Sequence, residues 1–226
     1  MATYGRGSSP GPARWGRPEL LYPLVLPVID LVVRALFRVE VHGIAHLPRR
    51  GPVVLAANHV SYLDPCVLAC VSYRAGRRIR FLALSDLFSK PGLGRLLRAG
   101  RMIPVHRGQG AEPMLQDARA ALAAGEAVLV YPEGTIPAPG VTVEAQRGAG
   151  LLALETSAPV LPVGSWGLGR RRSKGPRLRR RAVVVFGEPL DLGPLRARSD
   201  RAVGRDAANA LLDAVRERVL EAKARA

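Results

Sequence analysis

The chain has 226 residues, of which 48% are hydrophobic and 23% charged, a composition typical of a globular protein and not of a disordered chain. Its length supports one substantial domain or at most two small ones. With 34 Lys and Arg against 18 Asp and Glu, its formal net charge is +16. Such an excess indicates an anionic partner: a nucleic acid, a phospholipid surface or a phosphorylated substrate.

The first segment, residues 1–18, is rich in Gly, Pro, Ser and Arg and shows no hydrophobic periodicity. We predict a disordered basic tail there. The apolar stretch that follows lacks a small-residue cleavage site, so we do not expect a secretory signal.

Residues 19–38 form a hydrophobic segment. Its apolar run over residues 20–37 is slightly shorter than the ~20 residues of a membrane span. The run also contains Asp30 and Arg34, and each would cost roughly 2.5–3.5 kcal/mol at a bilayer centre. We therefore expect a helix that lies in the membrane interface in preference to a span. The alternative is a helix packed on the domain, and one helix can do both.

Beyond residue 38, apolar runs alternate with helical patterns. Strands are predicted at residues 52–57, 79–84, 102–105, 127–131, 159–164 and 182–187. Helices are predicted near residues 64–73, 86–98, 112–124 and 144–157. This alternation predicts a single α/β domain over residues 39–200, with a mixed, largely parallel central sheet flanked by helices. Residues 201–226 are predicted to form an amphipathic C-terminal helix packed on the domain.

Half of the net charge lies in residues 170–181, which carry eight Lys and Arg and no acidic residue. A solvated loop is one reading of this run. The alternative is contact with an anionic partner such as a phospholipid surface or a nucleic acid. No aromatic residue interleaves with the run, although stacking platforms for single-stranded nucleic acid need them.

The two cysteines, Cys66 and Cys70, lie at positions i and i+4 of a predicted helix. They share one face without the geometry for an easy disulfide. The sequence contains no CxxC or Cys/His cluster typical of zinc. We expect reduced thiols in the core.

The most informative stretch is residues 58–65, which read NHVSYLDP directly after a predicted buried strand. A carboxylate near an imidazole can fix the tautomer of the ring and stabilise the imidazolium that forms when the ring takes a proton. His59 and Asp64 are therefore candidates for a catalytic pair. The alternative is that Asp64 caps a helix whose first residue is Pro65, and that His59 is a hydrogen-bonded structural histidine.

Two further charged residues follow predicted strands. Arg107 stands beside Gly108, and guanidinium suits phosphate because it forms two parallel hydrogen bonds. Glu133 lies on a Pro-Glu-Gly turn, and ligands of α/β sheets gather outside the carboxyl ends of strands. The alternatives are a solvated arginine and an ordinary turn.

Four segments together resemble, in order, the motifs of the glycerolipid acyltransferase family, the phospholipid/glycerol acyltransferases typified by 1-acylglycerol-3-phosphate acyltransferase. They are residues 58–64, 100–107, 131–135 and 160–163. The resemblance covers about residues 40–190. Its first and third motifs are quite specific, the second moderately so and the fourth weak.

The resemblance implies that His59 is a general base that Asp64 orients. The imidazole would take the proton of an acceptor hydroxyl as that oxygen attacks the thioester carbonyl of acyl-CoA or acyl-carrier protein. General-base assistance typically contributes about 10²–10⁴-fold. No metal or other cofactor is implied, since the acyl thioester is a co-substrate.

The resemblance further implies a set of substrate-binding residues: Asn58, Arg107, Glu133, Gly134 and Thr135. The acceptor it implies first is a lysophospholipid, 1-acylglycerol-3-phosphate. Many family members follow Glu-Gly-Thr with Arg and Ser, whereas here residues 136–140 read IPAPG. An acceptor with another head group, such as a glycolipid, therefore stays open.

The resemblance places the protein as a peripheral or monotopic enzyme on the cytoplasmic face of the cell membrane, with an anionic membrane surface as partner. The competing classes are a non-catalytic anionic-lipid binding protein and a nucleic-acid binding protein. The latter leaves the four ordered motifs unexplained and lacks a recognisable nucleic-acid module, so we do not expect nucleic acid as a partner.

Overall fold

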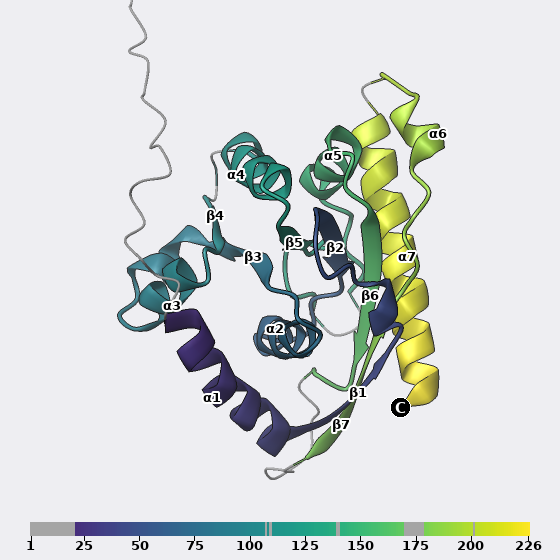
Figure 1. Ribbon diagram of the computed structural model, residues 1–226. Helices are drawn as coiled ribbons and strands as arrows, with labels where there is room; N and C mark the ends of the chain where they lie inside the picture. Colours follow the sequence, from purple (N-terminus) through teal and green to yellow (C-terminus); the bar gives the residue numbers. More distant parts are fainter. Residues whose placement is uncertain (1–20, 107, 109, 139–140, 170–178, 201) are drawn as a thin grey trace, which may run out of the picture.

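The computed structural model describes residues 21–106, 108, 110–138, 141–169, 179–200 and 202–226 (Figure 1). The helices are α1 (Leu21–Leu36), α2 (Asp64–Arg74), α3 (Leu93–Ala99), α4 (Glu112–Ala123), α5 (Arg147–Glu155), α6 (Gly193–Arg196) and α7 (Val203–Arg225), with short 3-10 turns η3 (Ile44–His46) and η4 (Ser85–Ser89). The strands are β1 (Phe37–His42), β2 (Val53–Ala57), β3 (Ile79–Leu84), β4 (Ile103–Val105), β5 (Ala127–Val130), β6 (Val160–Trp166) and β7 (Arg180–Phe186).

The strands form one sheet in the order β1-β7-β6-β2-β5-β3-β4. Neighbouring strands are parallel except for β6 and β7. β1 and β7 therefore run opposite to the other five strands. The predicted α/β domain with a mixed, largely parallel sheet flanked by helices is confirmed.

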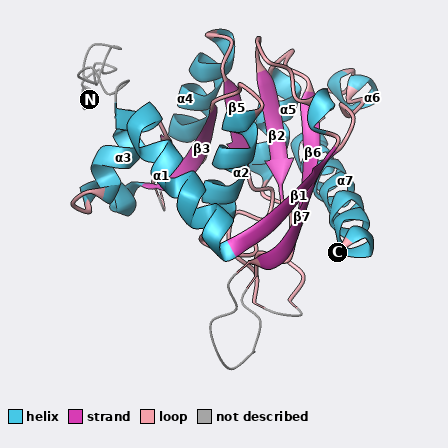
Figure 2. Cartoon of the chain, turned by 60° about the horizontal axis from the view of Figure 1, so that its bottom comes forward, coloured by secondary structure: helices cyan, strands magenta, loops and turns pink. Residues whose placement is uncertain are grey.

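The sheet divides the core into two layers because side chains alternate along each strand. In β2, Val53, Leu55 and Ala57 pack with residues of α1 and α2, whereas Val54 and Ala56 pack with residues of α4, α5 and α7. Figures 1 and 2 show these two groups of helices on opposite faces of the sheet. A strand covered on both faces needs apolar residues at every position, which explains the uninterrupted apolar run that predicts β2.

The C-terminal helix α7 lies along β6 and approaches its backbone closely at Gly164. A Cβ atom at this position would lie 2.2 Å from the carbonyl carbon of Arg218. Only glycine therefore permits this packing distance. The amphipathic pattern of residues 201–226 corresponds to α7, whose Leu211 and Val215 are fully buried.

Besides the unpredicted four-residue helix α6, two elements differ from the sequence-based expectation. The helix predicted at residues 86–98 is instead η4 followed by α3, because Pro91 holds Lys90 in an extended conformation and Gly92 has a φ of +75°. The strand β1 was not predicted. Its charged residues Arg38 and Glu40 alternate with valines at the edge of the sheet, and α1 runs into it at Leu36 without a turn signal.

The predicted hydrophobic segment is helix α1 through Leu36, and it packs on α2 through Leu26 and Val33, which are 2% and 3% exposed. Asp30 accepts a hydrogen bond from Arg34 at 2.7 Å and lies 3.6 Å from Arg74 of α2. In the part of the chain that the structure describes, no helix is both long and apolar enough to cross a bilayer.

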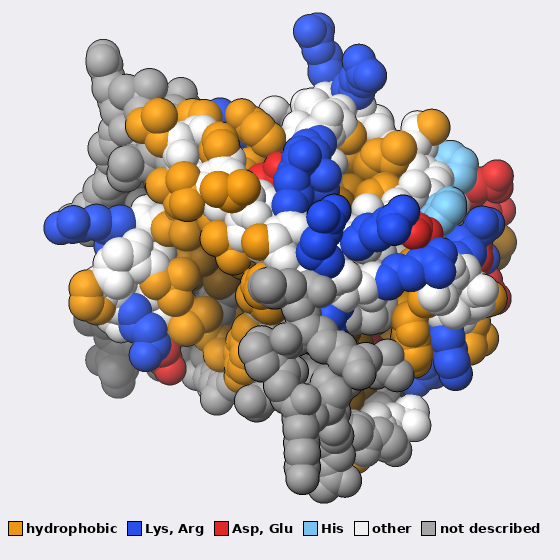
Figure 3. Space-filling model, turned by 90° about the horizontal axis from the view of Figure 1, so that it is seen from below, with side chains coloured by type: hydrophobic (Ala, Val, Ile, Leu, Met, Phe, Trp, Pro, Cys, Tyr) orange, Lys and Arg blue, Asp and Glu red, His pale blue; other side chains and the backbone are white. Residues whose placement is uncertain are grey.

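The opposite side of α1 is apolar and exposed. We define its exposed stripe as Leu24, Val28, Leu31 and Val32, which are 68%, 61%, 69% and 50% exposed. Figure 3 shows hydrophobic side chains gathered on one side of the face seen from below, with Lys and Arg side chains across the rest. Helix α1 therefore has one face packed on the domain and a second, exposed apolar face. The first agrees with the packed helix that the sequence left open, and the second leaves membrane contact as a prediction.

The cysteines are free thiols, with Cys66 half-buried and Cys70 buried, as predicted. Burial, and to a smaller extent the charge of Asp30, raises the pKa of the Cys70 thiol to about 12. Both cysteines pack in the core layer between the sheet and helices α1 and α2.

Residues 1–18 and 170–178 lie outside the described residues, so the predicted tail and most of the basic run have no structural account. The last arginines of that run are engaged within the fold. Arg180 donates to the carbonyl oxygens of Gly167 and Gly169, and Arg181 pairs with Glu40 and donates to the last carbonyls of α7. Arg180 thus connects the start of β7 to the residues after β6, and Arg181 connects it to β1 and to the C-terminal end of α7.

Candidate active site

The candidate site lies where β2 and β5 end side by side. The two strands are parallel neighbours in which Ala56 pairs with Val130. The residues that follow each strand therefore emerge at the same edge of the sheet. This arrangement brings His59 next to Tyr131 and Glu133, which lie more than 70 residues later in the chain.

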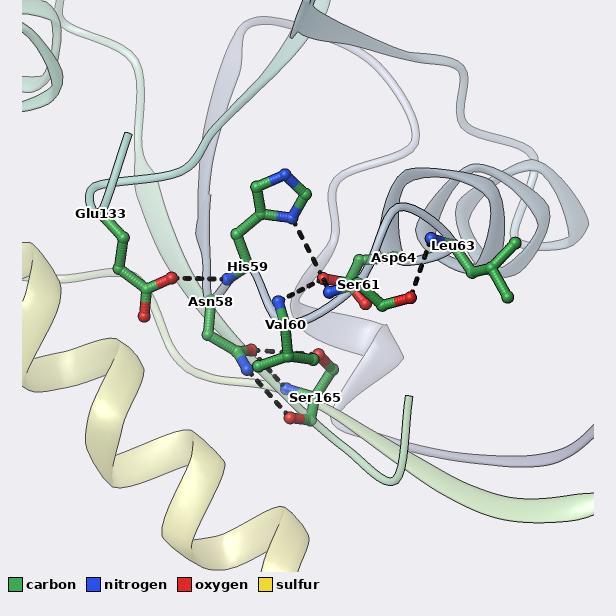
Figure 4. Close-up of polar contacts among 8 residues, drawn as sticks. All are labelled: Asn58, His59, Val60, Ser61, Leu63, Asp64, Glu133 and Ser165. Carbon is green, nitrogen blue, oxygen red and sulfur yellow. Dashed lines mark hydrogen bonds and ion pairs between the residues drawn. The ribbon is translucent and has the colours of Figure 1, made fainter. Parts of the chain in front are cut away.

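His59 and Asp64 face each other across the loop between β2 and α2 (Figure 4). The Nδ1 atom of His59 lies 3.1 Å from Oδ2 of Asp64. The same oxygen accepts the backbone N–H of Val60 at 2.6 Å and that of Ser61 at 2.9 Å. Because Asp64 is the first residue of α2, with Pro65 after it, its carboxylate points back into the loop and fixes the path of the backbone.

The hydrogen bonds define the tautomer of His59. The carboxylate oxygen accepts two backbone N–H groups and can only accept from Nδ1 as well, so Nδ1 carries the proton of the neutral ring. Nε2 is then the unprotonated nitrogen. The Asp64 side chain is fully buried, whereas the His59 side chain keeps 17% of its surface exposed. The pair thus combines a fixed, enclosed carboxylate with a reachable basic nitrogen.

Glu133 holds the backbone of His59. Its Oε2 atom accepts the N–H of His59 at 2.7 Å. Burial raises the pKa of Glu133, and the hydrogen bond and charge of His59 partly offset this rise. Glu133 was predicted to bind substrate. The structure adds a role in placing the loop between β2 and α2, and contact with an acceptor stays a prediction.

Gly134 and Thr135 continue the turn after Glu133. Gly134 has a φ of +65°, and its N–H donates to the carbonyl of Tyr131 at 2.9 Å. The positive φ favours glycine, and a Cβ atom there would lie 2.5 Å from Cγ of Gln146, so a larger residue would also displace the Gln146 side chain. Thr135 is exposed. Both residues lie at the sheet edge next to His59, and their contact with substrate stays a prediction.

Asn58 links the loop between β2 and α2 to β6. Its amide donates to the carbonyl of Ser165 at 3.0 Å and accepts the N–H and hydroxyl of Ser165 at 2.7 and 3.1 Å. In this structure both ends of the amide are therefore engaged within the protein, although Asn58 was predicted to bind substrate. The sequence carries no signal for the role of Ser165, because only the order of strands brings it next to Asn58.

Tyr131 is a second neighbour that sequence reasoning did not assign. Its ring is stacked on the imidazole of His59, with the two ring centroids 4.1 Å apart and the planes inclined by 13°. Because Tyr131 immediately follows β5, the parallel pairing of β2 and β5 places the two rings together.

Two predicted segments remain, residues 100–107 and residues 160–163. Arg107 is outside the described residues, so phosphate binding by this residue stays a prediction. Strand β4, which precedes it, lies at the end of the sheet, two strands beyond β5. Residues 160–163 of β6 are all buried and belong to the core. In the described ranges, no group of three or more His, Cys, Asp or Glu side chains is arranged to hold a metal ion.

Known proteins resemble this chain in sequence and in fold. A family model described as "Acyltransferase" matches residues 38–166. The match begins in β1 and ends with β6. It includes both the loop that carries His59 and Asp64 and the turn that carries Glu133.

Two curated relatives show what the matched region is similar to. A lyso-ornithine lipid O-acyltransferase of Rhizobium meliloti (strain 1021) is 41% identical over 100 residues, which cover 43% of this chain and 32% of that protein. The human 1-acyl-sn-glycerol-3-phosphate acyltransferase alpha is 30% identical over 144 residues, which cover 62% of this chain and 50% of that protein. The chain thus spans about a third to a half of the length of these relatives.

A solved structure has the same fold. The crystal structure of the 1-acyl-sn-glycerophosphate (LPA) acyltransferase PlsC from Thermotoga maritima matches with a TM-score of 0.63 and 23% identity. The match covers 92% of this chain and 78% of that one.

Proposed function

Because the chain belongs to the phospholipid/glycerol acyltransferase family, we propose that it moves a fatty acyl group from an acyl thioester to a hydroxyl of a lysolipid. The observation that carries this proposal is the His59–Asp64 pair, in which the carboxylate is buried and Nε2 is left as a reachable base. The donor is acyl-CoA or acyl-carrier protein.

The transfer proceeds by direct attack. Nε2 of His59 takes the proton of the acceptor hydroxyl as its oxygen forms a bond to the thioester carbonyl carbon. The C–S bond of the resulting tetrahedral adduct then breaks. The leaving sulfur receives the proton from the imidazolium, so that the ring returns to its starting state. Asp64 stabilises the imidazolium between these steps, and no protein nucleophile is needed.

The acceptor that we propose first is 1-acylglycerol-3-phosphate, which the names of the human protein and of the Thermotoga maritima enzyme support. Lyso-ornithine lipid is the second candidate, because the rhizobial relative is 41% identical over the matched residues. The atypical sequence after Thr135 lies at the turn beside His59 and is therefore a candidate determinant of the head group.

The test offers the purified protein radiolabelled acyl-CoA or acyl-carrier protein together with 1-acylglycerol-3-phosphate, lyso-ornithine lipid or a glycolipid. We expect labelled diacylated product with one of the lysolipids and none without an acceptor. If the glycolipid is acylated and neither lysolipid is, the acceptor is a glycolipid and the proposed lysolipid acceptors are wrong. Absence of transfer in all combinations would contradict the enzymatic function and favour a lipid-binding role.

We further propose that the exposed stripe of α1 docks the protein on an anionic membrane as a peripheral or monotopic enzyme of the cytoplasmic face. The stripe is apolar and exposed, and it lies beside arginines such as Arg34 and Arg38. Basic residues close to an anionic leaflet contribute about 1 kcal/mol each. Docking through α1 would bring the enzyme to an acceptor that resides in the bilayer.

Substitution of Leu24, Val28 and Leu31 by glutamine should weaken binding to anionic vesicles. Full burial of an aliphatic side chain contributes about 1.5–3 kcal/mol. If half of this is realised at each position, the triple variant binds at least about 30-fold more weakly in a vesicle sedimentation assay.

The matched control compares two single variants. Leu220→Gln changes a leucine on α7 that is 65% exposed, and Leu24→Gln changes a leucine on α1 that is 68% exposed. Only Leu24→Gln should weaken sedimentation. Equal sedimentation of the triple variant and the native protein would show that α1 is not the docking element.

A further inference from the structure

The imidazole of His59 is held at one edge and on one face. Asp64 fixes the edge through Nδ1, at 3.1 Å. The ring of Tyr131 covers a face, with a centroid separation of 4.1 Å and an interplanar angle of 13°. A single hydrogen bond leaves the ring free to tilt about the N–H···O direction, whereas a stacked neighbour fixes its plane. The two contacts together determine the direction in which Nε2 points.

The hydroxyl of Tyr131 does not explain why a tyrosine lies at this position. Its oxygen is buried and has no hydrogen-bond partner among the described residues. Burial, followed by the charge of Asp64, raises the pKa of Tyr131 well above its ordinary value, so the phenol stays neutral throughout the working range of a histidine base. A buried hydroxyl without a partner is unfavourable for stability. The position therefore makes use of the ring and not of the oxygen.

An aromatic face also favours the charged form of its neighbour. The π face of a tyrosine ring carries negative potential, which attracts a cation lying over it. During acyl transfer His59 becomes an imidazolium, and its stacked position places that charge over the Tyr131 ring. The interaction is thus stronger in the state that follows proton transfer than in the resting state, which is the condition for a rate effect.

We propose that Tyr131 is a positioning residue for acyl transfer, whose ring fixes the plane of His59 and stabilises the imidazolium. This inference rests on the proposed acyltransferase function and deepens it. Tyr131 acts through His59, on whose ring it is stacked.

The test compares aromatic and non-aromatic residues at the same position. In Tyr131→Phe the ring is kept and the unpartnered hydroxyl is removed, so kcat should stay within about threefold of the native value. In Tyr131→Leu and Tyr131→Met the ring is lost, and kcat should fall by at least about 10-fold while KM changes by less than about threefold. Tyr73→Leu, at an exposed tyrosine of α2, is the matched control and should leave both constants unchanged.

A spectroscopic measurement separates this inference from the proposed reaction. The carbon-bound ring protons of a stacked histidine experience the ring current of its neighbour. We expect the His59 signals, assigned by their disappearance in His59→Gln, to keep their chemical shifts in Tyr131→Phe and to shift in Tyr131→Leu and Tyr131→Met. This readout does not require a substrate, and it also shows whether each variant is folded.

The outcomes are distinguishable. Native kcat in a folded, non-aromatic variant would overturn the role of the ring. An equal loss of kcat in Tyr131→Phe and Tyr131→Leu would overturn it as well, since the hydroxyl would then be the active group. If the native protein transfers no acyl group but the His59 signals shift as expected, the proposed function fails while the stacked geometry stands.

Discussion

Replacement of His59 by alanine is expected to lower kcat for acyl transfer by about 10²–10⁴-fold, the usual contribution of a general base. The acceptor hydroxyl would then have to lose its proton to water, while binding of both substrates is retained. KM should therefore change much less than kcat. The measurement is the initial rate of labelled product formation with the best acceptor found for the native protein.

His46→Ala is the control for this prediction. His46 lies in η3 and bonds to the carbonyl of Phe186 through Nδ1 at 3.1 Å, apart from the loop of His59. Its replacement should leave kcat within about threefold, because it removes a histidine that has no part in the reaction. Comparable rates for His59→Ala and the native enzyme would rule out His59 as the general base.

Replacement of Asp64 by asparagine should lower both activity and stability. An amide cannot reproduce the contacts of the Asp64 carboxylate, whose Oδ2 atom accepts from His59, Val60 and Ser61. If the amide oxygen takes the place of Oδ2, an NH₂ group occupies the Oδ1 position, which is buried and has no hydrogen bond among the described residues. If the amide is reversed, NH₂ meets three donors. Either arrangement leaves polar groups unpaired.

We expect the free energy of unfolding of Asp64→Asn to fall by about 2–3 kcal/mol, since bonds to charged groups contribute about 1.5–3 kcal/mol each. We expect kcat to fall by about 10²–10⁴-fold, because the imidazolium is no longer stabilised. Denaturant unfolding and initial rates measure the two effects. Asp213→Asn is the matched control, as the Asp213 side chain is 69% exposed and pairs with Arg216 at the surface of α7, where such pairs contribute little.

The double variant His59→Ala/Asp64→Asn supplies a further check. Residues that act as one unit have effects on kcat that do not add. The rate of the double variant should therefore be close to that of His59→Ala. A further loss equal to that of Asp64→Asn alone would show that Asp64 contributes to catalysis by a route that does not involve His59.

The local features of the site follow from short stretches of sequence. An apolar run predicts β2, and the Asp64-Pro65 step predicts the start of α2. A loop of six residues between a strand and a helix is short enough that His59 and Asp64 meet across it. The turn at residues 131–135 is likewise predicted by a buried strand and its Pro and Gly residues. These features depend on neighbours in the chain, so sequence patterns describe them well.

The predicted helix at residues 86–98 shows the limit of such patterns. Its apolar periodicity is helical, but the Pro91-Gly92 step divides it into η4 and α3. The edge strand β1 shows the opposite case, a strand that forms although its sequence pattern is weak. Its alternating charged residues are a weak strand signal, and its place is set by pairing with β7, which begins 143 residues after β1 does. Partners distant in sequence decide such elements.

The sequence by itself indicated the class of the fold, the family and His59 and Asp64 as a candidate pair, because each of these is read from short motifs and their order along the chain. Only the tertiary structure decided what surrounds that pair. The ring of Tyr131 on His59, the bond from the His59 backbone to Glu133 and the link between Asn58 and Ser165 join residues 72, 74 and 107 positions apart. They exist because β5 and β6 lie on either side of β2. That order is set by how the whole sheet packs between its two layers of helices, and no local pattern specifies it.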